Sequence, residues 1–192
     1  VHIKGNAYIR KAARIYMIAE DGVLQVDGDL QICNSEYFCG GNNGCWWSCG
    51  TLILGGDLRA GKYTDGQHSM CFTGTTVILN GKKPQKIDTS RSPYNFTFSY
   101  LDMKQAERVT FTNSNLHAKY IWGYNKIANK AITLKDMHIS LQNDEEYNGE
   151  LLLINSTMDL NKHRFRIKGN LEQISSIVLL NGGTLHTNGY YI

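Results

Sequence analysis

Apolar and polar residues alternate along short segments of this chain. Leu24 and Val26 are two positions apart, as are Leu52 and Leu54. Side chains at positions i and i+2 of a strand lie on the same face, so we expect these four residues to point into a core. The residues between them are then expected to face outward. The pattern predicts short β-strands.

A short motif recurs between the predicted strands: an apolar residue, one further residue, Gly, then Asn or Asp, then another apolar residue. Gly5, Gly28 and Gly56 occupy this motif and are separated by 23 and 28 residues. Near the other end of the chain, residues 160–170 align with residues 180–190 at a constant offset of 20 residues. Such a period is typical of a parallel β-solenoid, in which each coil stacks its strands on those of the next coil.

The Gly-Asx pairs are expected at the bends between strands. Gly tolerates positive φ, and Asn or Asp side chains hydrogen bond to nearby backbone at turns. Stacking of coils would align Asp29 with Asp57 in a column. Two stacked carboxylates resemble a catalytic pair, but Asn6 and Asn170 occupy the same position of the motif. We therefore interpret the column as structural.

These features predict one all-β domain over residues 1–192. We expect a right-handed parallel β-helix, or β-solenoid, with coils of roughly 20–28 residues. Residues 33–49 carry Cys and Trp and lack the repeat, so we interpret them as a Cys-rich loop insertion. A solenoid exposes unpaired strand backbone at its ends. Because the repeat already runs at residues 3–5 and still runs at residues 189–192, we expect either a longer chain or copies stacked end to end.

The cysteines are unevenly distributed, with four of the five inside the loop insertion. Disulfides are the simplest account, because a Gly- and Asn-rich loop has little packing of its own and gains most from cross-links. An odd number leaves one free thiol. The spacing does not match the paired two-residue spacing of strong zinc motifs, so a metal site and unpaired thiols stay open as alternatives. The disulfide candidates are Cys33, Cys39, Cys45, Cys49 and Cys71.

The same loop contains four aromatic residues, which are Tyr37, Phe38, Trp46 and Trp47. Exposed rings on a cross-linked loop could stack on sugar rings or dock a protein, because a rigid aromatic side chain loses little entropy on binding. Alternatively, one or both Trp side chains close over the solenoid core. Both interpretations stay open at this point.

A run of acidic residues, Asp144, Glu145 and Glu146, offers a possible calcium site. Calcium prefers carboxylate and carbonyl oxygens, and a further ligand would have to approach from another part of the chain. A solvated turn is the alternative interpretation of this segment.

The charge pattern excludes several classes of partner. The chain contains 20 Lys and Arg against 17 Asp and Glu, and they are scattered. Nucleic-acid surfaces need clustered basic residues, so no nucleic-acid partner is expected. The longest apolar runs, such as residues 151–154, are too short to span a bilayer, and we expect no membrane insertion.

The usual motifs of hydrolases, kinases, zinc proteases and EF-hands are missing from the sequence. We therefore assign no catalytic residue, cofactor or metal, and predict that the chain is not an enzyme. The remaining enzyme alternative is a β-helix polysaccharide lyase or hydrolase, which needs carboxylates or basic residues gathered on one outer face. Candidates for such a face are Asp27, Asp29, Asp57, Arg59, Asp102, Lys104 and Arg108.

Residues 160–171 and 179–189 resemble the repeats of bacterial extracellular parallel β-helix proteins, and residues 77–87 are similar to another segment of such proteins. Solenoids of this kind serve as adhesin stalks, surface-layer modules, filament subunits and polysaccharide-processing scaffolds. The resemblance implies an extracellular or cell-surface location and a structural or adhesive role, with self-association into a filament as one form of it. Glycan binding through the aromatic loop is the alternative function, besides the lyase or hydrolase.

Overall fold

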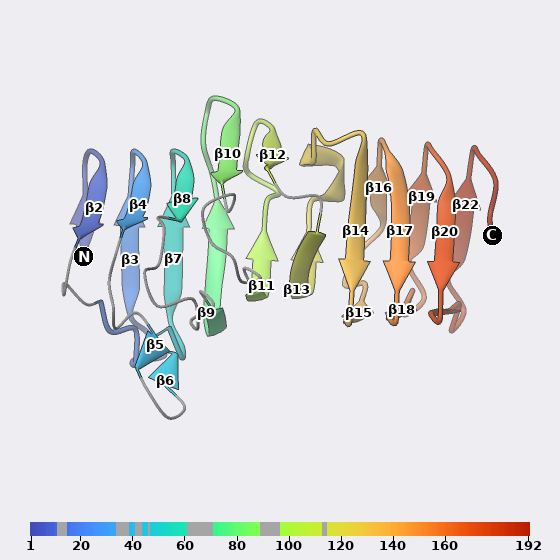
Figure 1. The fold of residues 1–192 in the computed structure, drawn as a ribbon, viewed down its shortest axis with the longest axis horizontal. Helices are drawn as coiled ribbons and strands as arrows, with labels where there is room; N and C mark the ends of the chain where they lie inside the picture. The colour runs from blue at the N-terminus through green and yellow to red at the C-terminus, as the bar shows by residue number, and fades with distance from the viewer. Residues whose placement is uncertain are drawn as a thin grey trace.

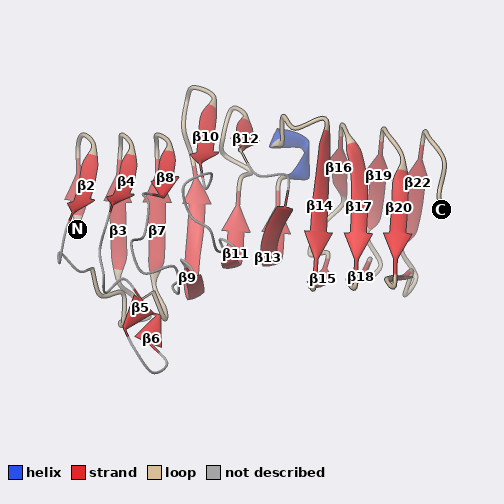
Figure 2. Cartoon of the chain, in the orientation of Figure 1, coloured by secondary structure: helices blue, strands red, loops and turns tan. Residues whose placement is uncertain are grey.

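The computed structural model of the chain is a parallel β-solenoid, which confirms the predicted fold class. The structure describes residues 1–10, 15–33, 39–40, 44–45, 47–60, 71–88, 97–112 and 115–192. Its coils lie side by side along one axis from the N-terminal to the C-terminal part (Figure 1). Within the described part, the only helix is a 3-10 turn, η1, at Tyr124–Lys126, and all other regular elements are strands (Figure 2).

The longest sheet has nine strands, and every neighbouring pair in it is parallel. In spatial order its strands are β1 (His2–Ile3), β3 (Val23–Val26), β7 (Thr51–Leu54), β9 (Cys71–Leu79), β11 (Thr97–Asp102), β13 (Asn115–Trp122), β14 (Ala131–Lys135), β17 (Glu150–Ile154) and β20 (Leu171–Ile174).

The coils of the first half add a second strand each to a five-stranded parallel sheet. Its strands are β2 (Ala7–Arg10), β4 (Leu30–Cys33), β8 (Leu58–Ala60), β10 (Gln85–Asp88) and β12 (Val109–Phe111). A separate antiparallel pair is formed by β5 (Cys39–Gly40) and β6 (Gly44–Cys45).

The coils of the second half carry three strands each, because two further parallel sheets replace the five-stranded one. One sheet consists of β15 (His138–Ser140), β18 (Thr157–Asp159) and β21 (Ile177–Leu179). The other consists of β16 (Glu145–Tyr147), β19 (Arg164–Ile167) and β22 (Thr184–Thr187).

An Asx ladder joins the bends of the first coils, as the repeated motif predicts. The Asp29 backbone N–H donates to Asn6 Oδ1 at 2.8 Å, across 23 residues of sequence. The Asp57 N–H donates to Asp29 Oδ1 at 2.9 Å, across 28 residues. The next step has the Lys86 N–H donating to Asp57 Oδ1 at 2.8 Å. Each side chain thus satisfies a backbone donor of the following coil, so the column has a structural role.

The reason for Gly in this motif differs from the predicted one. Gly28 and Gly56 do not adopt positive φ. A Cβ on Gly28 would lie 2.2 Å from Asn6 Oδ1, and one on Gly56 would lie 2.5 Å from Asp29 Oδ1. Gly is therefore needed because each ladder oxygen lies against the Cα of the next coil.

Among the described residues, positive φ occurs at Gly50, Gly123 and Gly182, and at bends of the later coils residues other than Gly adopt it as well. Asp136, Asn155 and Ser175 have φ of 56°, 48° and 51°, and they follow β14, β17 and β20 in three successive coils. Asn and Asp tolerate this left-handed region better than most residues because their short side chains hydrogen bond locally. Here Asn155 Nδ2 donates to Asp136 Oδ1 at 2.7 Å.

The core runs along the inside of the coils. Leu24, Val26, Leu52 and Leu54 are all buried, which confirms the predicted inward register. The pairing Leu24–Leu52–Val77 shows how inward residues of consecutive coils stack on one another. Apolar burial of this kind is the main source of stability in a solenoid, where each coil contacts only its neighbours.

No helix among the described residues has the length and apolar character needed to cross a bilayer. The last coil exposes the apolar side chains of Ile174, Ile177 and Leu179. Self-association through the ends of the solenoid stays a prediction.

Candidate functional site

Three aromatic rings form a stack on the outward side of the nine-stranded sheet. Tyr100 on β11 packs against Tyr120 on β13, with ring centroids 5.1 Å apart and an angle of 7° between the ring planes. Trp122 on β13 is nearly parallel to both, at 6.3 Å from Tyr100 and 6.4 Å from Tyr120. All three side chains are half-buried. We call Tyr100, Tyr120 and Trp122 the aromatic row.

Parallel strand pairing explains why these rings meet. Tyr100 is the register partner of Tyr120 across β11 and β13. Leu101 and Ile121 are also register partners, and both are buried, so the residues on either side of them face outward. Trp122 lies two positions after Tyr120 and therefore shares its face.

Two lysine side chains lie over the rings. Lys104 Nζ is 5.7 Å from the centroid of the Trp122 ring, and Lys119 Nζ is 5.4 Å from that of Tyr120. At these distances an ammonium is attracted to the negative face of the ring. Lys104 also forms an ion pair with Asp102 at 3.4 Å.

A shallow depression of about 420 Å³ adjoins the row at Tyr100. Thr51, Thr76 and Tyr100 are register partners on β7, β9 and β11, so the two hydroxyl-bearing side chains continue the line of the rings. Lys119 and Ser99 also line the depression. The row therefore borders a polar surface with several hydrogen-bonding groups.

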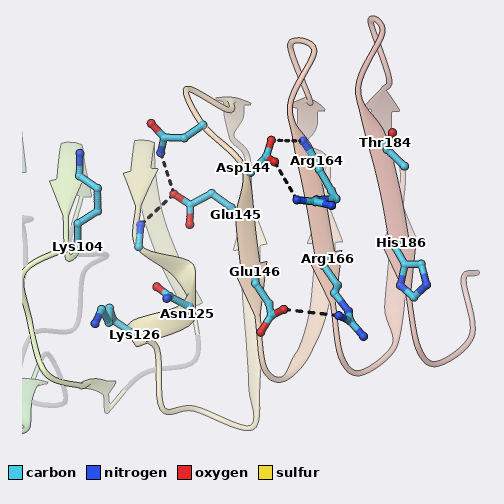
Figure 3. A pocket seen from close by; sticks show the side chains of 12 residues that line it. Lys104, Asn125, Lys126, Asp144, Glu145, Glu146, Arg164, Arg166, Thr184 and His186 are labelled. Carbon is cyan, nitrogen blue, oxygen red and sulfur yellow. Dashed lines mark hydrogen bonds and ion pairs between the residues drawn. The ribbon is translucent and has the colours of Figure 1, made fainter.

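A larger groove of about 840 Å³ lies beyond the other end of the row, and Lys104 lines it (Figure 3). We call it the charged groove. Its floor includes outward residues of β16, β19 and β22 that are register partners: Glu146, Arg166 and His186. A second acidic residue, Asp144, pairs with Arg164 Nη2 at 3.2 Å.

Opposite charges in the charged groove largely compensate one another. Glu146 Oε1 lies 2.8 Å from Lys168 Nζ, and this hydrogen bond lowers the pKa of Glu146. The Arg164 backbone N–H donates to Asp144 Oδ1 at 2.9 Å and lowers the pKa of that carboxyl. Both carboxylates thus serve strand-to-strand pairing.

Glu145 faces the other way and is the one buried carboxylate on this strand. Its oxygens accept hydrogen bonds from the backbone N–H groups of Gly123 and Tyr124, each at 3.1 Å. Asn143 Nδ2 donates a third hydrogen bond at 3.2 Å (Figure 3). Desolvation raises the pKa of Glu145 despite these bonds. Because Gly123 directly follows Trp122, Glu145 anchors the backbone at the end of the aromatic row.

The predicted calcium ligands do not converge. Glu145 points toward η1, whereas Asp144 and Glu146 are bound by Arg164 and Lys168. The described residues contain no group of three or more His, Cys, Asp or Glu side chains that could hold a metal ion. The solvated-turn alternative also fails in part, because Glu145–Tyr147 form strand β16.

Of the four aromatic residues predicted as a binding loop, the structure describes only Trp47. Tyr37, Phe38 and Trp46 lie outside the described residues. Trp47 is 1% exposed and packs edge to face on Phe72, with ring centroids 5.0 Å apart. Trp47 therefore belongs to the core, and its ring is not available to a ligand at the surface.

The cysteine predictions are tested only at Cys49. Its thiol is free and half-buried, with Sγ 3.7 Å from the Met17 carbonyl oxygen, so Cys49 is not a disulfide partner in this structure. Cys39 and Cys45 are register partners in the antiparallel pair β5–β6. The side chains of Cys33, Cys39, Cys45 and Cys71 lie outside the described part of the chain.

The carboxylates considered for a lyase or hydrolase are engaged in structural contacts. Asp29 and Asp57 belong to the Asx ladder, and Arg59 pairs with them at 3.6 and 2.9 Å. Asp27 lies 2.9 Å from His2 Nε2. Asp102 pairs with Lys104, and Arg108 is exposed beside β12. This set is spread over several coils and forms no pair of free carboxylates.

The sequence interpretation missed the aromatic row. A usable signal was present, because Tyr100 and Tyr120 are separated by the same 20 residues as the repeats near the C-terminus. Placing the middle of the chain in that register would have aligned the two rings.

Comparisons with models of protein families, with curated protein sequences and with solved structures find no match to this chain.

Proposed function

We propose that this chain is an adhesive β-solenoid module that binds polysaccharide through the aromatic row. The observation that carries the proposal is the parallel arrangement of Tyr100, Tyr120 and Trp122, half-buried on an outward sheet face. The ring of a sugar has apolar C–H faces that pack on aromatic side chains, and its hydroxyl groups need hydrogen-bonding partners at the edges.

The row has the properties of a rigid anchor. Strand pairing and mutual stacking already order the three rings, so little side-chain entropy is left to lose on binding. Tyr and Trp combine a large apolar area with a polar atom, which is why they dominate binding energy in many interfaces. Thr51 and Thr76 beside Tyr100, and Lys104 beside Trp122, supply hydrogen-bonding groups next to the rings.

The proposed location is extracellular, at a cell surface. Support comes from the resemblance of residues 160–171 and 179–189 to repeats of extracellular β-helix proteins. A solenoid is a stiff rod that can hold a binding face away from its attachment point. Adhesion to a glycan therefore suits this architecture.

The test is binding to a panel of polysaccharides, measured by pull-down and by intrinsic tryptophan fluorescence. The fluorescence change is assigned to Trp122 by comparison with Trp122→Phe, because the chain also contains Trp46 and Trp47. We expect Trp122→Ala or Tyr120→Ala to weaken binding by about 30-fold or more, the size of an aromatic hot spot. The matched control is Tyr190→Ala, which removes a ring that is 52% exposed in the last coil.

Circular dichroism and the urea midpoint establish that each variant is folded. If no polysaccharide of the panel binds, the proposal is wrong. It is equally wrong if folded Trp122→Ala and Tyr120→Ala bind as tightly as the wild-type protein, since the row would then only stabilise the coil.

A further inference from the structure

We infer that the polysaccharide recognised by the aromatic row is anionic, carrying carboxylate or sulfate groups that bind Lys104 and Lys119. This inference rests on the proposed function and narrows its ligand class. It follows from the position of the two ammonium groups, each directly over a ring of the row.

Lys119 provides the first of the two ammonium groups. Its side chain is exposed, and its ammonium lies 5.4 Å from the Tyr120 ring centroid. Among the described residues, no carboxylate oxygen forms an ion pair with it within 4.0 Å. The ring attracts the cation but neutralises no charge. The ammonium therefore keeps donors for an incoming anion.

Lys104 occupies the corresponding place over Trp122. Its partner Asp102 lies at 3.4 Å, and the lysine side chain is 53% exposed. Because the lysine end of this pair is open to solvent, water screens the attraction and the ammonium is accessible to a second anion. Lys104 also lines the charged groove together with Lys126, which has no ion pair with any described residue.

Two other carboxylates, Glu20 and Glu145, lie near this region, and neither forms an ion pair with Lys104 or Lys119 within 4.0 Å. Glu20 lines the depression with Lys119 but forms no ion pair with it. Glu145 is buried at the edge of the groove, and three hydrogen bonds hold its carboxylate; Lys104 interacts with it electrostatically but forms no ion pair with it within 4.0 Å. The row is thus flanked by ammonium groups at both of its β13 rings, and the carboxylates nearby have partners or lie farther away.

A sugar that packs against the solvent-exposed part of the row places its ring substituents next to the ammonium groups over Tyr120 and Trp122. A carboxylate or sulfate there makes a charge-assisted hydrogen bond, which is about twice as strong as the bond a neutral hydroxyl makes. Because the site is open to solvent, the advantage of the charged sugar is expected to shrink as salt is added. Uronic acids and sulfate esters share this chemistry.

The experiment compares charged polymers with neutral polymers of the same backbone. The first pair is polygalacturonate and its full methyl ester, and the second is dextran sulfate and dextran. We expect at least one charged polymer to bind about tenfold tighter than its neutral partner at low salt, with the ratio falling at high salt. The pair that shows the difference identifies carboxylate or sulfate as the preferred group.

Variants of Lys104 and Lys119 test whether these two residues cause the preference for the charged polymer. Lys104→Gln with Lys119→Gln should weaken binding of the charged polymer by about tenfold and weaken binding of its neutral partner much less. The matched control is Lys135→Gln with Lys162→Gln, which removes two exposed lysines away from the row.

Three outcomes overturn the inference. Equal binding of charged and neutral polymers that still depends on Trp122 would refute the anionic ligand and leave the proposed function intact. A charge preference that survives in the Lys104→Gln, Lys119→Gln double variant would refute the assignment of these lysines. Failure of every polymer to bind would overturn both this inference and the proposed function.

Discussion

Replacing Gly28 by Ala tests the packing that allows one coil to follow the next. A Cβ at this position would lie 2.2 Å from Asn6 Oδ1 and 2.9 Å from the Gly5 carbonyl carbon. Ordinary contacts of a Cβ begin at 3.4 Å, so the Asn6 oxygen would have to move by about 1.2 Å. That oxygen is the acceptor of the 2.8 Å hydrogen bond from the Asp29 N–H.

The cost has two parts. Losing the ladder hydrogen bond removes about 1 kcal/mol of stability, because the bond is exposed and water partly replaces it. Forcing a methyl group against the backbone of the preceding coil adds about 1–3 kcal/mol, the usual range for overpacking. Together we expect Gly28→Ala to lower the free energy of unfolding by about 2–4 kcal/mol relative to a Gly→Ala change without the clash.

Gly5→Ala is that reference, because a Cβ there meets no atom within 4 Å and Gly5 does not have positive φ. We expect it to be neutral or to stabilise by about 0.4–1 kcal/mol through the unfolded state. Urea denaturation followed by circular dichroism measures both variants. Equal midpoints for Gly28→Ala and Gly5→Ala would refute the close-approach explanation of the Gly-Asx motif.

Two further changes test the ladder and the buried carboxylate. Asp57→Asn keeps an acceptor oxygen for the Lys86 N–H, so we expect it to lower the free energy of unfolding by no more than about 1 kcal/mol, through loss of the ion pair with Arg59. Asp57→Ala also removes the acceptor and should lower it by about 1 kcal/mol more. Equal urea midpoints for the two variants would contradict the ladder. Glu145 has a pKa raised above its ordinary 4.5, so its contribution to stability is full below that pH and is lost as the pH rises through the folded-state pKa. The free energy of unfolding of the wild-type protein should therefore fall relative to that of Glu145→Gln between acid and neutral pH; a difference independent of pH would contradict the buried, desolvated carboxylate.

The fold could be predicted because a solenoid converts sequence periodicity directly into contacts. The 23-residue spacing of Gly5 and Gly28 reappears as the Asn6–Asp29 hydrogen bond. Alternation placed Leu52 and Leu54 inside correctly. The sequence pattern could not show why Gly occupies the motif. Close approach of the backbone and positive φ both favour Gly, and only the three-dimensional structure distinguishes the two causes.

The candidate site was harder to predict because it depends on two coils at once. Trp47 was an obvious binding candidate by composition, yet its neighbour Phe72 buries it. Tyr100 and Trp122 are unremarkable in the sequence, and they meet only after β11 and β13 pair. In the sequence, Glu145 belongs to an acidic run that is expected at the surface. In the structure, strand alternation points its side chain inward, where it accepts a hydrogen bond from the Gly123 backbone N–H.

Ring stacking alone does not require a ligand in this fold. Neighbouring strands lie about 4.8 Å apart, so equivalent aromatic residues on consecutive coils must stack, as Tyr100 and Tyr120 do at 5.1 Å and Phe72 and Phe98 do at 5.4 Å. The two stacks differ in their surroundings. Phe72 and Phe98 are buried and stabilise the core, whereas the aromatic row is half-exposed. The row also carries two ammonium groups and lies between a depression and a groove. This contrast, more than the stacking itself, favours a binding role for the outer rings.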